Sequence, residues 1–584
     1  MVKKLLSGNE AIALGAYENG VKVAAAYPGT PSTEILENVA KYEGIAAQWS
    51  PNEKVALDVA VGAAYAGKRA LAAMKHVGVN VASDALFYVA YTGLSGGLVI
   101  VTADDPGMHS SQNEQDNRNY AKFAKVPMLE PSDSAECRDF VGYGLEISER
   151  FDTPVLLRTS TRIAHSYSPV EVDDEKKGPI GDGEAKSYVI DRAKYVMVPG
   201  FARGRHPVVE QRLVALAAYA EEFSGNRIEW GSDELGIVTG GIAYQYAREV
   251  FKNASFLKLG MSYPLPKKKI KDFASRVKRL IVVEDLDPFW EEQVRLMGIP
   301  IEGKKYFPIV GEFSPDVVRK AAFEAGLIDK GEEITPVEIP PLPARPPILC
   351  VGCRHRGVFY TLKKQKVVVN GDIGCYTLSV MPPLSATDTC GCMGASIGVA
   401  HGVDKAGTKQ KAVATIGDST FFHSGIPPLI NIAYNKGTSL TVILDNRVTA
   451  MTGHQDHPGT GRTLQGEETV AIDIEGLVRA CGIENVWTVD PWKLKEVERA
   501  VKAALASDKP SVIIAKGPCV LRSRERHPAI VVNAERCNGC GLCLAIGCPA
   551  VIKVGDKVTV DDMQCIGCTL CMQTCARKAM SVSA

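Results

Sequence analysis

The chain has 584 residues, and its 67 lysines and arginines balance its 67 acidic residues, so that the formal net charge is zero. This length exceeds what one hydrophobic core supports and predicts roughly three to five domains. A neutral chain does not favour nucleic acid as a partner. The longest apolar runs, such as residues 98–101, are too short to span a membrane. The N-terminal sequence MVKKLLSGNE lacks a secretory signal, so we expect a cytoplasmic protein that does not bind a membrane.

Residues 1–168 form the first predicted unit. Helical stretches alternate there with short apolar segments, which is typical of a parallel α/β sheet. The expected strands cover 23–29, 96–106 and 153–159. The charged segment 170–186 that follows predicts a linker.

A second α/β unit is predicted over residues 190–333, with strands at 234–241 and 279–287. Six prolines then occur in the thirteen residues 335–347. Because proline-rich chain is stiff and extended, this segment predicts a connector between domains. The third α/β unit covers 348–520, and its expected strands are 366–374, 411–419, 439–446 and 511–517.

Two strands of the third unit end in residues suited to a metal–diphosphate site. Glycine lets the backbone approach a diphosphate, and carboxylate, amide and carbonyl oxygens are the ligands that Mg²⁺ prefers. The residues expected there are Gly417, Asp418, Ser419, Asn446 and Val448. Such strand ends are also ordinary turns, but ligands of open parallel sheets bind at these ends. The 28-residue spacing from Asp418 to Asn446 is typical of a thiamine diphosphate site with Mg²⁺.

Eight of the 16 cysteines lie in the last 48 residues, in two runs. A [4Fe–4S] cluster needs four thiolates, and in two-cluster ferredoxins each run supplies three to one cluster and its last cysteine to the other. The first expected set is Cys537, Cys540, Cys543 and Cys575, and the second is Cys565, Cys568, Cys571 and Cys548. The first run departs from the usual spacing by one extra residue in its last gap. Two zinc sites are the alternative, but zinc does not require the third cysteine of each run.

Six further motifs complete the pattern. They are YPGTPSTE (27–34), SPNEKVALDVAVGAAYAG (50–67), KHVGVNVASD (75–84), CVGCRHRG (350–357), NGDIGCYTL (370–378) and GDSTFFHSGIPPLINIAYNK (417–436). With these motifs the chain resembles the 2-oxoacid:ferredoxin oxidoreductases, in particular the branch acting on aryl pyruvates. The resemblance covers nearly all residues. Val351 and Arg354 depart from the two prolines common in the family's CPGCPHR motif.

The resemblance implies a fold class and an order of domains. We expect an α/β multidomain protein with parallel-sheet thiamine-binding domains, a transketolase C-terminal-like domain and a ferredoxin-like α+β domain. The expected ranges are 1–168 for the pyrimidine-binding domain, 190–333 for the transketolase C-terminal-like domain, 348–520 for the diphosphate-binding domain and 528–584 for the domain with two clusters.

The resemblance also implies four catalytic residues. Glu53 matches the glutamate that hydrogen-bonds the thiamine aminopyrimidine, and Thr30 matches a segment facing the substrate. Arg118 resembles the arginine that pairs with the 2-oxoacid carboxylate, a geometry that guanidinium favours. His355 is expected as a proton donor or hydrogen-bond partner. The alternatives are a helix-capping Glu53, a solvated Arg118 and a structural His355.

A third cluster is a further hypothesis from the resemblance. Related enzymes place a [4Fe–4S] cluster beside the cofactor, and the matching residues are Cys350, Cys353, Cys375 and Cys519. Cys390 and Cys392 are alternative ligands. The alternative is that Cys350 and Cys353 form only a turn near the thiamine and that the other two matching cysteines are small buried hydrophobic side chains. His454 and His457 are expected in a loop that covers the diphosphate.

The implied reaction is the oxidative decarboxylation of indolepyruvate and related aryl-2-oxoacids with CoA, giving aryl-acetyl-CoA, CO2 and reduced ferredoxin. The implied partners are a small beta subunit in an α2β2 assembly and an external ferredoxin. Two rival functions stay open. A non-oxidative thiamine-dependent decarboxylase would not need the ferredoxin cysteines, and a pure electron-transfer subunit would not need Asp418 and Asn446.

Overall fold

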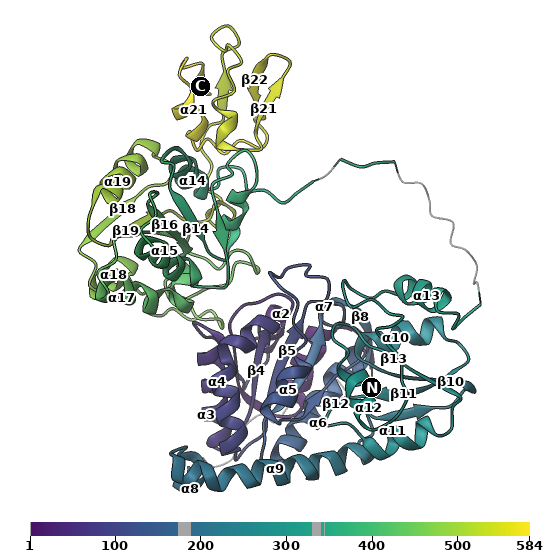
Figure 1. Ribbon diagram of the computed structural model, residues 1–584. Helices are drawn as coiled ribbons and strands as arrows, with labels where there is room; N and C mark the ends of the chain where they lie inside the picture. The colour runs from purple at the N-terminus through teal and green to yellow at the C-terminus, as the bar shows by residue number, and fades with distance from the viewer. Residues whose placement is uncertain (1, 173–187, 330–339, 344, 584) are drawn as a thin grey trace. The chain divides into compact units, whose positions relative to one another are not determined.

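The computed structural model describes residues 2–172, 188–329, 340–343 and 345–583. The chain divides into two compact units, an N-terminal unit (Met1–Val337) and a C-terminal unit (Glu338–Ala584), and Figure 1 shows their elements. Most of the predicted linker at 170–186 and part of the proline-rich segment at 335–347 lie outside the described residues. Among the described residues, no helix combines the length and apolar character needed to cross a lipid bilayer.

A seven-stranded sheet forms the centre of the N-terminal unit (Figure 1). Its strands, in spatial order, are β12 (Met261–Tyr263), β6 (Met128–Leu129), β7 (Val155–Ser160), β5 (Leu98–Asp104), β4 (Arg69–Lys75), β2 (Val21–Ala26) and β3 (Ala46–Trp49). All neighbours are parallel except β12, which is antiparallel to β6. The central strands β5 and β7 are buried throughout, as expected for parallel strands covered on both faces.

Helices pack on this sheet and on one another. Helices α3 and α4 share one core with β4 and β5, and α1 packs against α6. The helices of this part are α1 (Gly8–Glu18), α2 (Thr33–Val39), α3 (Glu53–Tyr65), α4 (His76–Thr92), α5 (Arg118–Ala124), α6 (Ser134–Phe151) and α7 (Thr161–His165). Strand β1 (Val2–Ser7) pairs with β8 (Tyr167–Val172) in an antiparallel ribbon.

A smaller four-stranded sheet follows in the same unit. Its order is β13 (Arg279–Val283), β10 (Ser232–Gly240), β11 (Ala254–Leu259) and β9 (Arg227–Glu229). The helices of this part of the sequence are α8 (Arg192–Tyr195), α9 (Pro199–Glu222), α10 (Gly241–Val250), α11 (Lys267–Ala274), α12 (Phe289–Leu296) and α13 (Pro315–Glu324). Strand β12 comes from this part of the sequence but belongs to the seven-stranded sheet, and α9 packs on α4 and α6. The first two α/β segments therefore fold as one compact unit.

The C-terminal unit begins with a six-stranded, fully parallel sheet. Its order is β15 (Thr389–Cys390), β14 (Val368–Gly371), β16 (Ala412–Gly417), β17 (Leu440–Asp445), β19 (Ser511–Lys516) and β18 (Asn485–Val489). Alternate residues of β16 enter two different cores, since successive side chains of a strand point to opposite faces. Helices α14 and α19 cover one face, and α15, α17 and α18 cover the other.

The helices of this sheet are α14 (His355–Lys364), α15 (Ala395–Lys405), α16 (Asp418–Thr420), α17 (Ile426–Tyr434), α18 (Ile474–Ala480), α19 (Leu494–Ala506) and α20 (Val520–Ser523). The cysteine-rich end of the chain carries two antiparallel strand pairs and a short helix. They are β20 (Ile530–Val532) with β23 (Met580–Val582), β21 (Val551–Val554) with β22 (Lys557–Val560), and α21 (Leu570–Thr574).

Every strand predicted by residue range is present, with bounds that differ by a few residues at one or both ends. The parallel α/β prediction is confirmed for both units.

Candidate active site

The strand ends of β16 and β17 bring two carboxylates together in the C-terminal unit. These strands are parallel neighbours, with Gly417 opposite Leu444, so Asp418 and Asp445 lie at the same edge. Both side chains are buried. Burial, together with the negative charge of Asp418, raises the pKa of Asp445 to about 6. The pair is a site of concentrated negative charge.

Each carboxylate is held by its surroundings. Asp418 Oδ2 accepts hydrogen bonds from the Arg447 backbone N–H at 2.7 Å and from His457 Nε2 at 3.1 Å. Its Oδ1 accepts from the Ser419 N–H at 2.9 Å. Asp445 Oδ1 lies 3.2 Å from Arg447 Nε but accepts no hydrogen bond within the described part of the chain. This buried oxygen and the like charge beside it make the site suited to a divalent cation.

The expected magnesium ligands lie on the same turn. Asn446 Oδ1 accepts a hydrogen bond from the Val448 N–H at 3.2 Å, which orders the turn after β17. Val448 is itself buried. The donor set of Asp418, Asn446 and the Val448 carbonyl consists of the oxygen ligands that fit Mg²⁺. A side chain at Gly417 would meet the Tyr376 ring at 2.9 Å, so only glycine allows this close packing.

His355 lies beside this site at the start of α14. Its side chain is buried, and its ring packs against Tyr376 at 5.9 Å between centroids. Burial lowers the pKa of His355 to about 4, although the charge of Asp418 acts in the opposite direction. The imidazole is therefore neutral near pH 7. This favours the expected role as a hydrogen-bond partner over the expected role as a proton donor.

The N-terminal unit holds Glu53 in the first turn of α3. Asn52 caps this helix, because its side chain accepts from the Val55 N–H at 2.9 Å. Glu53 is therefore not the capping residue. It is 5% exposed and packs against α4, where a side chain at Gly78 would come within 2.8 Å of its Cγ and Oε1 atoms. This burial distinguishes Glu53 from an ordinary surface glutamate.

Thr30 lies in the turn between β2 and α2, which packs against the end of β4. A side chain at Gly29 would be 3.1 Å from Lys75 Cβ. Lys75 Nζ donates to the Ser110 carbonyl at 2.6 Å, and burial lowers the pKa of Lys75 to about 8. Asp105 lies in the same cluster, where it accepts from the Ser110 N–H at 2.8 Å.

Sequence reasoning missed Lys75, Asp105 and Asp445. All three lie at or just after the ends of parallel strands, as Asp418 does. The same positional signal could have found them. His457 was expected only in a covering loop, and the structure gives it a direct contact with Asp418.

Arg118 is buried among acidic side chains of the protein. Its side chain is 0% exposed. Nε and Nη2 donate to the Asp116 carboxylate, Nη1 donates to Glu284 at 2.7 Å, and Nη2 also reaches the Asp285 carbonyl at 2.8 Å. The expected solvated alternative is wrong, and a guanidinium enclosed by protein carboxylates does not favour a substrate carboxylate. We therefore leave Arg118 out of the proposed site.

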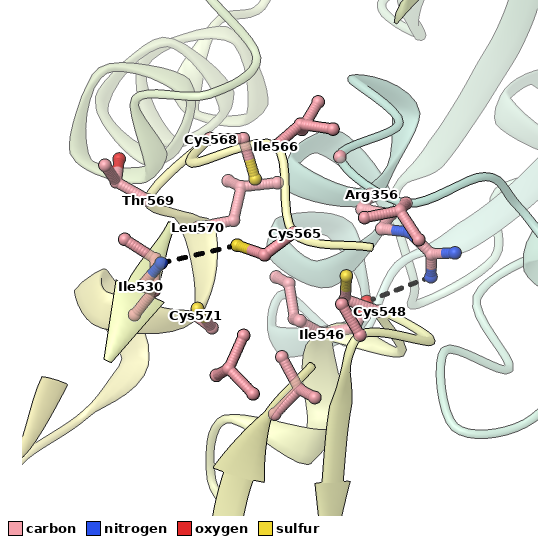
Figure 2. A pocket seen from close by; sticks show the side chains of 15 residues that line it. Arg356, Ile530, Ile546, Cys548, Cys565, Ile566, Cys568, Thr569, Leu570 and Cys571 are labelled. Atoms are coloured by element: carbon pink, nitrogen blue, oxygen red, sulfur yellow. Dashed lines mark hydrogen bonds between the residues drawn. The ribbon is translucent and has the colours of Figure 1, made fainter. Parts of the chain in front are cut away.

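The eight C-terminal cysteines line two separate pockets. One pocket is lined by Cys548, Cys565, Cys568 and Cys571, as Figure 2 shows, and the other by Cys537, Cys540, Cys543 and Cys575. Each pocket combines three cysteines of one run with the last of the other, the grouping that crossed ligation requires. Among the described residues, no three or more His, Cys, Asp or Glu side chains are arranged as ligands of one metal ion.

Backbone N–H groups point at several of these sulfurs. The Ile530 and Gly567 N–H groups each lie 3.4 Å from Cys565 Sγ, and the Ala579 N–H lies 3.3 Å from Cys575 Sγ. Such donors stabilise negative charge on sulfur. The donor set of both pockets therefore fits a cluster held by thiolates.

A third group of cysteines lies near the strand-end carboxylates. The thiols of Cys350, Cys353, Cys375 and Cys519 act on one another electrostatically. Burial, with this mutual effect, raises the pKa of Cys353 to about 12 and that of Cys375 to about 11. The Cys519 N–H donates to the Asn446 carbonyl at 2.9 Å, which ties this group to the magnesium turn.

The alternative cysteines lie differently. Cys390 and Cys392 are exposed, and the Cys390 thiol donates to the Asp372 carbonyl at 3.7 Å. Asp372 in turn accepts from the Gly394 and Ser396 N–H groups at the start of α15. This arrangement associates Cys390 with a helix terminus, so the first four cysteines are the better candidate set.

Comparison with known proteins identifies the family. A family model described as the C-terminal TPP binding domain of thiamine pyrophosphate enzymes matches residues 372–515. A second, for the thiamine-diphosphate-binding region of pyruvate flavodoxin/ferredoxin oxidoreductases, matches residues 14–212. Indolepyruvate oxidoreductase subunit IorA of Methanothermobacter thermautotrophicus is 42% identical over 99% of this chain and 97% of its own length. The same subunit of Archaeoglobus fulgidus is 42% identical over 99% and 97%, and that of Pyrococcus horikoshii 41% identical over 98% and 96%.

The chain belongs to the IorA family. It is a thiamine-diphosphate-dependent oxidoreductase of the 2-oxoacid:ferredoxin class, as the sequence motifs predicted. The matched region 14–212 contains Glu53, and the matched region 372–515 contains Asp418. The cysteine-rich end lies outside both matched regions but inside the alignment with the full-length relatives, which covers 99% of the chain.

Proposed function

We propose that this chain is the catalytic subunit of an enzyme that oxidatively decarboxylates indolepyruvate and related aryl-2-oxoacids. With CoA and ferredoxin, the products are aryl-acetyl-CoA, CO2 and reduced ferredoxin. The observation that carries this proposal is the C-terminal unit itself. It combines an acidic strand-end site with three groups of four cysteines in a chain whose full-length relatives are named indolepyruvate oxidoreductase subunits.

Thiamine diphosphate fits the residues present. Asp418, Asn446 and the Val448 carbonyl would hold Mg²⁺ against the diphosphate, and Gly417 lets the Tyr376 ring pack against this strand end. Glu53 would hydrogen-bond the aminopyrimidine. When bound, thiamine supplies a nucleophilic carbon and an electron sink for decarboxylation. The neutral imidazole of His355 would orient a polar group by hydrogen bonding, and the Thr30 hydroxyl would contact the substrate.

The cysteine groups would carry the electrons away. Their sulfurs fit two [4Fe–4S] clusters in the C-terminal ferredoxin-like domain, and the group around Cys350 fits a third. Because such clusters transfer one electron at a time, two electrons from each substrate can leave singly to an external ferredoxin. A non-oxidative decarboxylase would have no use for this set.

The relatives are named as subunits, which supports a partner chain. We propose a small beta subunit and an α2β2 assembly, with CoA as the acceptor of the aryl-acetyl group.

Metal and cofactor content test the proposal first. An anaerobic preparation of the complex should contain bound thiamine and about 12 iron atoms per chain, whereas about 8 would remove the third cluster. Iron without thiamine binding would reduce the chain to an electron-transfer subunit. Turnover of aryl pyruvates with CoA and a redox dye, but not of pyruvate, is the expected activity. Equal turnover of pyruvate would contradict the substrate class.

Glu53→Gln tests the site itself. It keeps the size of the side chain and removes its proton-accepting group, so kcat should fall by about 10²- to 10⁴-fold while thiamine still binds. The matched control is Glu37→Gln in the neighbouring helix α2, which should leave kcat unchanged. An unchanged kcat in Glu53→Gln would contradict its role.

A further inference from the structure

Arg356 lies three residues after the CxxC motif, in the first turn of α14, and none of the roles above uses it. Its side chain is 2% exposed. It donates to backbone carbonyls, Nε to Cys350 O at 3.1 Å and Nη1 to Ile546 O at 3.4 Å. Further bonds reach the Gly547 and Leu349 carbonyls. Figure 2 shows the guanidinium beside Cys548, with its bond to Ile546 dashed.

These carbonyls belong to two cysteine loops that are far apart in the sequence. Cys350 O is in the CxxC loop, and Ile546 O is in the first ferredoxin run. The CxxC loop also packs against the second ferredoxin run, because a side chain at Gly352 would meet Ile566 Cδ1 at 2.1 Å. Arg356 therefore connects the group around Cys350 with the pocket that contains Cys548.

The positive charge of Arg356 acts on cysteines of both groups. The thiols within its electrostatic reach are Cys350 and Cys353 on one side, and Cys548 and Cys568 on the other. Among the described residues, no carboxylate forms an ion pair with Arg356. A buried cation without an anion is unfavourable, so the position is suited to negative charge that the protein acids do not supply.

Arg354, two residues earlier, provides the contrast. Its guanidinium lies 3.6 Å from the centre of the Trp492 ring and pairs with Asp490 at 3.2 Å and with Glu525 at 2.9 Å. Its charge is therefore directed to aromatic and acidic partners. The two arginines lie two residues apart, and only Arg356 has backbone carbonyls and thiols as its neighbours in place of carboxylates.

We propose that Arg356 is a positioning residue that raises the reduction potentials of two iron–sulfur clusters together, those held by the Cys350 group and by the Cys548 pocket. This inference rests on the clusters of the proposed function. Each electron that enters a thiolate-held cluster adds one negative charge to it, and a fixed nearby cation stabilises that reduced form. Arginine stays protonated throughout, so no proton accompanies the electron. The cluster of the Cys537 pocket lies outside this set.

Potentials test the proposal directly. Anaerobic complexes carrying wild-type chain, Arg356→Gln, Arg356→Lys or Arg354→Gln are titrated with dithionite while each cluster is followed by electron paramagnetic resonance. In Arg356→Gln, the equilibrium constants for reducing the two nearby clusters should fall about tenfold, which corresponds to about 59 mV for a one-electron couple. The reduction potential of the cluster in the Cys537 pocket should not change. Arg356→Lys, which keeps the charge, and Arg354→Gln should both resemble the wild type.

Loading with iron gives the second readout. If Arg356→Gln loses iron while Arg356→Lys retains it with unshifted potentials, the positive charge is what these clusters need, and the proposal stands. Unshifted potentials in Arg356→Gln would overturn it, as would equal shifts of all three clusters or loss of iron in both variants. If the wild-type chain holds only about 8 iron atoms, it has no third cluster, and the predicted shift in potential applies to the cluster of the Cys548 pocket alone.

Discussion

Buried charged side chains have different partners in the two units. In the N-terminal unit, buried acids meet arginines of the same unit. Asp104 pairs with Arg158 at 2.7 Å, and Asp116 and Glu284 pair with Arg118 at 2.5 and 2.7 Å. Such pairs compensate much of the cost of removing ions from water, provided that both partners are present.

In the C-terminal unit, acidic groups lie beside one another instead. Asp418 and Asp445 are neighbours with one arginine, Arg447, 3.2 Å from Asp445, three groups of thiols face one another, and Arg356 is buried without an acidic partner among the described residues. Charges that one unit satisfies internally are thus left in the other for cations and clusters. The comparison indicates that the N-terminal charges maintain the fold, whereas the C-terminal charges prepare it for ligands.

Removing one partner of the N-terminal network should have the largest effect. Arg118→Ala leaves Asp116 and Glu284 buried without their cation, which should lower the free energy of unfolding by about 3–5 kcal/mol. Denaturant unfolding followed by hydrogen exchange in this unit measures it. The control is Arg162→Ala, which removes the exposed pair with Glu312 and should cost at most about 1 kcal/mol. Unchanged stability with a raised KM would instead indicate that Arg118 binds the substrate carboxylate.

A pH series on the wild type and on Asp445→Asn tests the C-terminal pair next. The difference between the two isolates Asp445, because burial also raises the pKa of Asp104 and of Glu284 in the N-terminal unit to about 7. The raised pKa of Asp445, about 6, means that the folded state binds its proton more tightly than the unfolded state does. Stability without ligands should therefore fall as pH rises from about 4 to about 6, by no more than about 3 kcal/mol. Mg²⁺ with thiamine diphosphate should flatten this slope, since the cation favours the ionised pair. Asp445→Asn should also remove the contribution of Asp445 to this slope. A slope unaffected by either change would contradict the cation site.

Removing one proposed ligand of Mg²⁺ should lower the affinity for the cation by a comparable free energy. Asp418→Asn removes one charge from the proposed ligand set and should weaken binding of Mg²⁺–thiamine diphosphate on the order of 100-fold, as measured by calorimetry under anaerobic conditions. Asp404→Asn is the matched control, because Asp404 already accepts from the Thr438 N–H at 2.7 Å in the same unit. Equal affinities for wild type and Asp418→Asn would place the cation elsewhere.

The sequence predicted the parts that depend on local spacing. The strands and the strand-end position of Asp418 follow from short apolar segments that alternate with helical ones. The grouping of the eight C-terminal cysteines follows from the short gaps within each cysteine run. Burial of Arg118 was not predictable, because its partner Glu284 lies 166 residues away. The way in which the first two α/β segments join was also not predictable. Only the tertiary structure shows that β12 completes the sheet of the preceding segment.

The smallest effect is expected where the N-terminal strand ends are already satisfied. Asp105 accepts hydrogen bonds from Ser110, Ser111 and Thr161, so it does not depend on Lys75 for compensation. Lys75→Met keeps the length of the side chain and removes one bond to the Ser110 carbonyl, which should change the free energy of unfolding by about 1 kcal/mol. Thermal unfolding and kcat are measured together. A large fall in kcat at unchanged stability would show that the Lys75 ammonium acts on the substrate, and the N-terminal strand ends would then be a ligand site like those of the C-terminal unit.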